Sequence, residues 1–238
     1  MKSMGWILFV TSCLAMAQND YFVGDSHTLM QIRGGWFEPQ ADGELYDFVE
    51  EELTFDRNRL DGISFDINIY RQLNNYVSLG GGVTGFGDSV SSEYRDFTFE
   101  DGDSITQTTR LDQTWVGFLT MITPFGAGSY YGSRAWAPKA VVPYLVLGAG
   151  VVQWEFSQEG DFVDVDTLDV FYDSFFTEGS TPSLRGALGI RVNLSKNIDL
   201  DIATTYDVAE DDVGDDFQGF GDIQLDAQHT SAGINLRF

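Results

Sequence analysis

The sequence predicts an all-β fold, an eight-stranded antiparallel up-and-down transmembrane β-barrel, and three observations support this prediction. Eight stretches alternate apolar and polar residues with a period of two, which places one kind of side chain on each face of a β-strand. The connections between these stretches are mostly short at one end and long at the other. The last stretch runs to the final residue of the chain, the aromatic Phe238.

The alternation defines the strands in order. Apolar residues fill one face of most stretches, and polar or small residues fill the other. Two stretches fit less well, because large apolar groups lie on both faces, such as Trp115 beside Val116 and Leu145 beside Val146. No stretch after Ala17 has convincing helical periodicity. The predicted strands are 28–37, 62–70, 76–86, 111–122, 141–156, 183–194, 198–208 and 229–238.

The connections carry most of the charge. Two short turns follow the second and sixth stretches, and both contain asparagine, a residue that turns favour. The long connections hold most of the 37 acidic residues. One end of the barrel is therefore predicted to carry long acidic loops, and the other to carry short turns. The connection 123–140 departs from this rule, since it is long and contains no acid; the long acidic connections are 38–60, 87–110, 157–182 and 209–227.

The amino terminus has the pattern of a secretory signal peptide: Lys2, a short apolar run and small residues before Gln18. We therefore expect a signal peptide at 1–17 and a single barrel domain at 18–238. Lipid attachment at Cys13 is the alternative, and the apolar residues directly after that cysteine argue against it. The net charge of −24 excludes nucleic acid as a partner.

Alternation alone does not say which face points inward. In a soluble barrel the apolar face is the core, whereas in an outer-membrane barrel it faces lipid. Strand length, loop asymmetry and aromatic residues near the strand ends favour the membrane. These rings are Trp36, Phe37, Tyr70, Tyr76, Phe86, Trp115, Trp154, Phe156, Tyr206 and Phe238. Charges of both signs then pair inside the lumen; those predicted there are Arg33, Asp66, Arg185, Arg191, Asp199, Asp201 and Arg237.

With these features, the chain resembles the small outer-membrane β-barrel family, typified by the transmembrane domain of outer-membrane protein A. The stretches that carry the resemblance are 142–151, 184–208 and 229–238. The resemblance implies an outer-membrane location, with short periplasmic turns and extracellular loops; the longer acidic loops of this chain and its connection 123–140 depart from the family pattern. It implies that outer-membrane lipids and lipopolysaccharide surround a monomeric barrel. It also implies that the barrel-assembly machinery reads Ile234, Leu236 and Phe238 as an insertion signal.

The sequence contains three candidate sites. His229 and Ser231 have the His-x-Ser spacing of a lipid-modifying enzyme, but no acid follows, so we expect no catalysis. Asp164, Asp166 and Asp169 are weak calcium candidates, because their order does not match an EF-hand, and we expect no other cofactor. Glycines at 79–87, 148 and 150 leave a narrow cleft or simply allow tight packing.

The expected function is that of a structural or surface-interaction protein without catalysis. The alternative is a narrow channel or small-solute carrier. A lipid-modifying enzyme or a soluble periplasmic ligand-binding barrel comes third.

Overall fold

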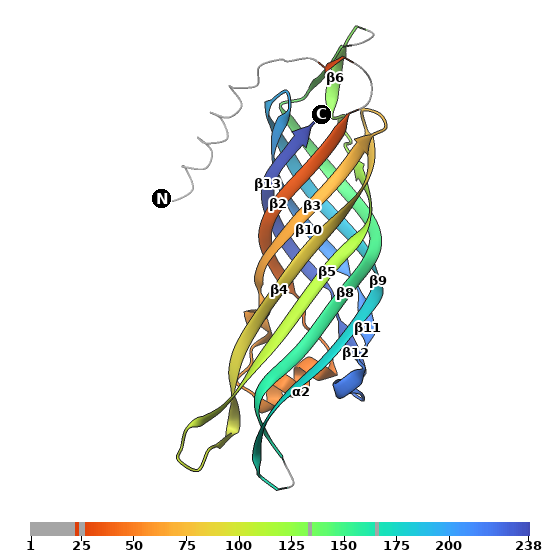
Figure 1. Ribbon diagram of the computed structural model, residues 1–238. Coiled ribbons are helices and arrows are strands. Elements are labelled where there is room, and N and C mark those ends of the chain that lie inside the picture. Colours follow the sequence, from red (N-terminus) through yellow and green to blue (C-terminus); the bar gives the residue numbers. More distant parts are fainter. Residues whose placement is uncertain (1–21, 24–26, 133–134, 165–166) are drawn as a thin grey trace, which may run out of the picture.

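The computed structural model describes residues 22–23, 27–132, 135–164 and 167–238. Eight strands close into one antiparallel barrel with the order β10-β13-β2-β3-β4-β5-β8-β9, which confirms the predicted fold class (Figure 1). Their bounds are β2 Thr28–Pro39, β3 Gly62–Gln72, β4 Val77–Thr98, β5 Ser104–Ile122, β8 Val141–Val163, β9 Val170–Ser195, β10 Ile198–Val208 and β13 Ala227–Arg237. The predicted signal peptide and Cys13 lie outside the described residues.

The last strand closes the barrel. β13 pairs along its length with β10 on one side and with β2 on the other. At the end of the β13–β2 pair, the backbones of Thr28 and Phe238 exchange two hydrogen bonds of 2.8 and 3.0 Å. Phe238 therefore takes part in closing the barrel, and its ring is 63% exposed on the outer face.

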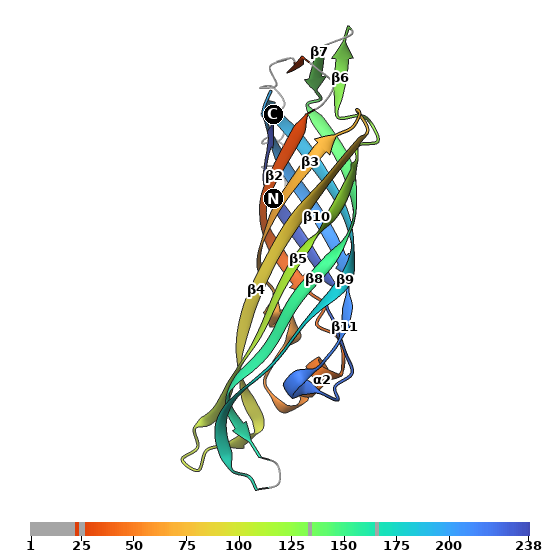
Figure 2. The ribbon, with the colours of Figure 1, turned by 45° about the vertical axis from the view of Figure 1, so that its right-hand side comes forward.

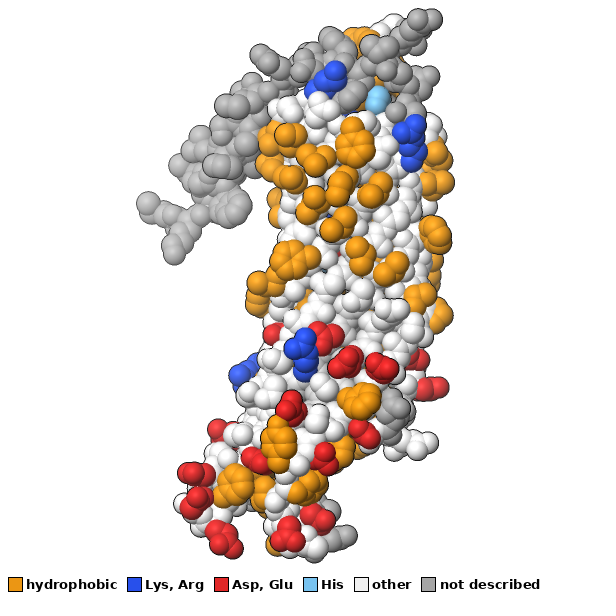
Figure 3. Space-filling view, viewed as in Figure 1, with side chains coloured by type: hydrophobic (Ala, Val, Ile, Leu, Met, Phe, Trp, Pro, Cys, Tyr) orange, Lys and Arg blue, Asp and Glu red, His pale blue; other side chains and the backbone are white. Residues whose placement is uncertain are grey.

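The two ends of the barrel differ. We call the end that holds the carboxyl terminus, the turns 73–76 and 196–197, and the connection 123–140 the turn end. The opposite end, with the connections 40–61, 99–103, 164–169 and 209–226, is the loop end. The acidic side chains gather at the loop end, while the turn end shows arginine and lysine (Figure 3).

The long connection 123–140 forms a small sheet at the turn end (Figure 2). Its strands β6 (Gly128–Tyr131) and β7 (Ala135–Pro138) form a hairpin, and β1 (Phe22–Val23) adds to β7. Trp136 of β7 is only 1% exposed. Its indole Nε1 donates a hydrogen bond of 3.2 Å to Asn75 Oδ1. The long connection at the turn end therefore contains a small sheet, with Trp136 buried against the end of the barrel.

The structure corrects two of the predicted loops. The connections 87–110 and 157–182 are mostly strand, because β4 and β5 continue to a turn at 99–103, and β8 and β9 continue to a turn at 164–169. In this region polar residues such as Gln107 and Thr109 occupy inward positions and are buried. Outward positions such as Thr106 and Arg110 are polar as well, so the apolar-polar alternation that marks the membrane-spanning part is absent although the strands continue.

The structure also corrects the expectation that the chain contains no helices. Helix α2 (Glu44–Glu52) lies across the loop end and buries Leu45, Tyr46 and Val49. It spans only nine residues and is rich in acids, so its periodicity is weak in the sequence. The shorter elements are η1 (Arg57–Leu60), β11 (Glu210–Asp212), η2 (Asp215–Phe217) and β12 (Asp222–Gln224). Among the described residues, no helix is long and apolar enough to cross a membrane.

The outer wall of the barrel is apolar between its two ends (Figure 3). Several outward side chains are more than 60% exposed, namely Ile63, Phe65, Phe118, Leu184 and Leu188. A broad band of exposed apolar side chains is typical of contact with lipid rather than water. The soluble barrel, whose apolar face would form the core, is therefore wrong.

The predicted aromatic girdles are only partly correct. Trp36, Tyr76, Tyr206 and Phe238 point outward, as expected of rings at a lipid interface. The other six point into the barrel: Phe37, Tyr70, Phe86, Trp115, Trp154 and Phe156. Neighbouring residues of a strand point to opposite faces, so a ring's position near a strand end does not fix its direction.

Candidate functional site: the lumen

The interior of the barrel is charged and electrically balanced. All seven charges predicted for the lumen lie inside, each no more than 5% exposed. The prediction omits Asp207, which lies on the same face of β10 as Asp201 and is 3% exposed. Among the described residues, the lumen thus contains four arginines and four aspartates. They are Arg33, Arg185, Arg191, Arg237, Asp66, Asp199, Asp201 and Asp207.

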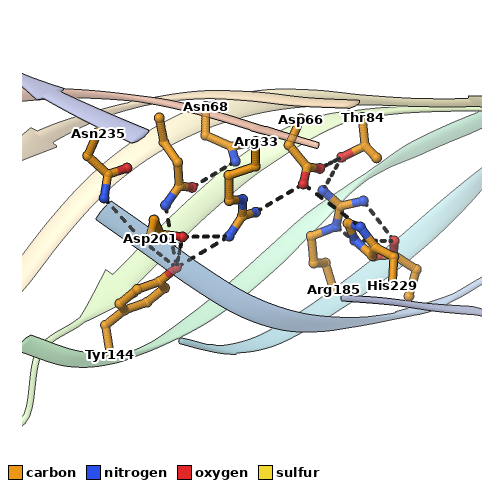
Figure 4. A network of polar contacts seen from close by, with 11 residues as sticks. Arg33, Asp66, Asn68, Thr84, Tyr144, Arg185, Asp201, His229 and Asn235 are labelled. Carbon is orange, nitrogen blue, oxygen red and sulfur yellow. Dashed lines mark hydrogen bonds and ion pairs between the residues drawn. The ribbon is translucent and has the colours of Figure 1, made fainter. Parts of the chain in front are cut away.

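Asp201 is the centre of one cluster (Figure 4). The Tyr144 hydroxyl contacts its two carboxylate oxygens at 2.8 and 3.0 Å. Arg33 donates from 3.4 Å and Asn235 from 3.1 Å. These four residues come from β10, β8, β2 and β13, so the cluster connects strands from opposite sides of the barrel. Charge-assisted hydrogen bonds of this kind offset the cost of burying the carboxylate.

Arg185 organises a second cluster nearer the loop end. Its guanidinium binds Asp207 with two hydrogen bonds of 2.6 and 2.7 Å and donates to the Thr84 hydroxyl at 2.7 Å. It also lies 3.8 Å from the centre of the Trp115 ring, a cation–π contact. Thr84 donates in turn to Asp66 at 2.6 Å, and Asp66 lies 3.4 Å from Arg33. The two clusters therefore form one network along the lumen.

A third ion pair lies toward the turn end. Arg237 contacts the Asp199 carboxylate at 2.5 Å, and Asn193 donates to the same carboxylate from 2.9 Å. Arg191 has no carboxylate within 4 Å among the described residues, and its guanidinium lies 5.7 Å from the Tyr144 ring centre. The charge is thus balanced over the lumen as a whole rather than pair by pair.

The structure supplies the acids that are missing beside His229 in the sequence. Its Nδ1 lies 3.8 Å from Asp66 and its Nε2 lies 3.9 Å from Asp207. Neither distance is a hydrogen bond. His229 is fully buried and Ser231 is 2% exposed, so this arrangement is enclosed by the barrel wall. A substrate on the lipid side does not reach it.

Small residues make room for the large rings of the lumen. A Cβ atom at Gly189 would lie 2.4 Å from the Tyr144 ring, and one at Gly150 would lie 2.9 Å from the Trp115 ring. At these two positions the absent side chains leave no cleft, because tyrosine and tryptophan occupy the space. Tyr144 belongs to β8 and Trp115 to β5. These are the two strands with large apolar residues on both faces, so the sequence does not indicate which of their faces points inward.

Buried polar and charged side chains occupy the lumen in the described part of the chain. Beside Arg185 and Trp115 there is a void of about 10 Å³, at the limit of what one water molecule needs. At the turn end, the Arg237 guanidinium lies 5.4 Å from the centre of the buried Trp136 ring. The loop end is filled by an apolar core that includes Leu45, Tyr46, Phe55, Leu60, Leu111, Phe156, Ile223 and Leu225.

The calcium candidates lie at the tip of the β8–β9 hairpin. The Asp164 carboxylate accepts a hydrogen bond of 3.0 Å from the Thr167 backbone, and the Asp169 backbone closes the turn. Asp166 lies outside the described residues. Among those that are described, no group of three His, Cys, Asp or Glu residues is placed to hold a metal ion. Calcium binding stays a prediction.

Two acids face each other in the β11–β12 hairpin. Asp212 is paired with Asp222, and a hydrogen bond between their carboxyl groups raises the pKa of Asp212 above its ordinary value. The folded hairpin therefore holds this proton more tightly than the unfolded chain does. Its stabilising effect is present at pH values below the ordinary pKa and is lost as the pH rises through the raised pKa.

At pH 7 we therefore expect Asp222→Asn to slow hydrogen exchange of the β11–β12 backbone, because it removes a repulsion between facing carboxylates. The matched control is Glu210→Gln, since Glu210 faces Gln224 in the same hairpin and not another acid. Equal protection by both substitutions would show that only the total charge of the loop matters.

The fold and the lumen define the class of protein. A closed eight-stranded barrel with an apolar outer wall, a charge-paired interior and a terminal aromatic strand has the construction of a small outer-membrane β-barrel. Barrels of this construction occur in outer membranes, which is the location that the sequence predicts.

Comparisons with known proteins agree. The solved structure of outer-membrane protein OprG from Pseudomonas aeruginosa has a TM-score of 0.51 at 13% identity, covering 90% of this chain and 96% of that one. Neisserial surface protein A gives 0.49 at 13% identity, with 90% and 100% covered. Ail of Yersinia pestis, crystallised with a heparin analogue, gives 0.41 at 13%, with 91% and 100% covered. No family model and no curated protein matches the chain. At these identities, the similarity to OprG shows a shared fold.

Proposed function

We propose that the chain is a non-conducting outer-membrane protein of structural or surface-interaction type, without catalytic activity. The observation that carries this proposal is the filled lumen: a charge-balanced network of buried side chains occupies the middle, the buried Trp136 ring lies beside Arg237 at the turn end, and an apolar core fills the loop end. The buried His229 and Ser231 are enclosed by the same wall, which supports the absence of catalysis.

The asymmetry of the barrel supports an orientation. The turn end faces the periplasm, and the loop end, with its acidic side chains and projecting hairpins, faces the exterior (Figures 1 and 3). The apolar wall is surrounded by outer-membrane lipids and lipopolysaccharide, and the barrel is a monomer. No residue of the lumen requires a cofactor in this proposal.

A narrow channel is the alternative function, and it differs from the proposed one in conducting ions. In a planar lipid bilayer, we expect the folded protein to give no steady ionic current. We expect the same of Trp115→Ala, because the enlarged void would still be closed at both ends. The folded state of each sample is checked by its shift in electrophoretic mobility on boiling. A steady current that increases with salt and changes in Trp115→Ala would establish a channel instead.

The proposed assembly signal gives a second test. Ile234 and Phe238 point outward and are 40% and 63% exposed. This position suits recognition by the barrel-assembly machinery. Deletion of Phe238 should therefore leave most of the chain unassembled in cells, as measured by the amount of heat-modifiable protein in outer membranes. Phe125→Ala is the control, because this ring is 70% exposed in the turn-end connection. Normal assembly of the deletion would contradict the proposed signal.

A further inference from the structure

A cavity of about 230 Å³ opens at the loop end, beneath α2 and between the β4–β5 and β8–β9 hairpins. Six aromatic rings line it: Phe48, Tyr94, Phe97, Phe162, Phe171 and Phe175. Figure 3 shows apolar side chains among the acids in this part of the molecule. The lumen network does not use any of them.

The walls of the cavity are held in place by contacts between strands. The Tyr94 hydroxyl accepts hydrogen bonds from Gln107 Nε2 at 3.0 Å and from the Val163 backbone at 3.4 Å. Gln107 also donates to the Asp161 carbonyl at 3.2 Å. On the opposite wall, Phe162 and Phe175 pack edge to face with their centres 4.7 Å apart. A preformed aromatic site loses little conformational entropy when a ligand binds.

The electrostatics of the cavity favour a cation. Glu52 is its sole charged lining residue in the described part of the chain. It is the last residue of α2, where the carbonyl end of a helix adds negative potential. Arg95, which is adjacent to the lining residue Tyr94, points its guanidinium to the Glu50 carbonyl at 3.2 Å and does not line the cavity. Aromatic faces beside a carboxylate are the chemistry that recognises organic ammonium ions.

We propose that this cavity binds a small organic cation, an ammonium group with an apolar body. The aromatic rings contact the apolar body of the ligand, and their faces contact its positive charge. Glu52 neutralises the ammonium. The proposal rests on the proposed function only in placing the loop end outside the cell. The cavity is tested on the purified, folded full-length barrel in non-ionic detergent, where orientation plays no part, so its failure leaves the closed barrel untouched.

The experiment titrates the barrel with benzyltrimethylammonium by calorimetry and follows the ligand methyl protons by NMR. We expect saturable binding with an upfield shift of the methyl signals, caused by the aromatic rings. Glu52→Gln should weaken binding by about threefold to tenfold, as removal of a partly exposed charge allows. Phe162→Leu should weaken it by about fivefold. Glu51→Gln is the matched control, because Glu51 is adjacent, exposed and absent from the cavity wall.

Neutral benzyl alcohol and anionic benzenesulfonate are the comparison ligands. Weaker binding of both, together with a selective effect of Glu52→Gln, supports the proposal. Equal binding of benzyl alcohol would overturn the preference for a cation. Equal loss in Glu51→Gln and Glu52→Gln would show attraction by the general charge of the loops and overturn the site. The absence of saturable binding or of an upfield shift would overturn it as well.

Discussion

Asp207→Ala should lower the free energy of unfolding of the barrel by about 3–5 kcal/mol, because it leaves the Arg185 guanidinium buried without its carboxylate. Both hydrogen bonds of this pair are short, at 2.6 and 2.7 Å, and both side chains are inside the barrel. The neighbouring Thr84 and Trp115 do not replace the lost charge. The measurement is equilibrium unfolding in lipid vesicles, followed by tryptophan fluorescence.

The control is the double substitution Arg185→Leu with Asp207→Leu. It removes both charges, so we expect it to be less destabilising than the single change. Arg191→Leu is a second comparison, because Arg191 has no carboxylate within 4 Å among the described residues and its removal leaves no ion pair broken. If the double variant is as unstable as the single one, the stability comes from packing around Arg185 and not from the pair.

Gly150→Ala should destabilise the barrel by roughly 1–3 kcal/mol through overpacking. A Cβ atom there would lie 2.4 Å from the Val116 carbonyl oxygen and 2.8 Å from the Gly117 Cα atom. Both are backbone atoms of the neighbouring strand β5, which cannot move away without disturbing its ladder. We expect a lower unfolding midpoint in denaturant and a changed tryptophan spectrum, because Trp115 lies over the same site.

Gly186→Ala is the matched control for this prediction. Gly186 lies in the neighbouring strand β9, and a Cβ atom added there meets no heavy atom within 4 Å. We expect its stability to equal or slightly exceed that of the parent protein, since alanine restricts the unfolded chain. Equal destabilisation by the two changes would show that any loss of glycine is harmful, independent of close approach between strands.

The sequence predicts the membrane-spanning part of the fold well, because lipid outside and charge inside impose a period of two. Beyond this part, water lies outside and the constraint disappears. Gln107 and Thr109 are inward and buried, yet nothing in their pattern separates a continuing strand from a loop. Helix α2 is missed for a related reason: it is short, and its apolar side depends on a core assembled from distant strands.

The charges of the lumen are predictable one strand at a time, whereas their partners are not. Arg33 and Asp201 are 168 positions apart and meet only when the barrel closes. Tyr144, which contacts that carboxylate, belongs to a strand with apolar residues on both faces, so it has no polar signature. The acids beside His229 come from β3 and β10. A short motif within one strand therefore does not reveal these two acids.

The continuation of β8 beyond the apolar wall has a consequence for what the cell surface presents. At about 3.3 Å per residue, the strand from Val151 to Val163 covers roughly 40 Å along its own axis. In the proposed orientation, with the loop end outside the cell, α2 and the hairpin tips therefore lie beyond the apolar wall on the outer side of the membrane. In that orientation, molecules of the surrounding medium contact α2 and the hairpin tips, while neighbouring molecules within the membrane contact the apolar outer wall of the barrel.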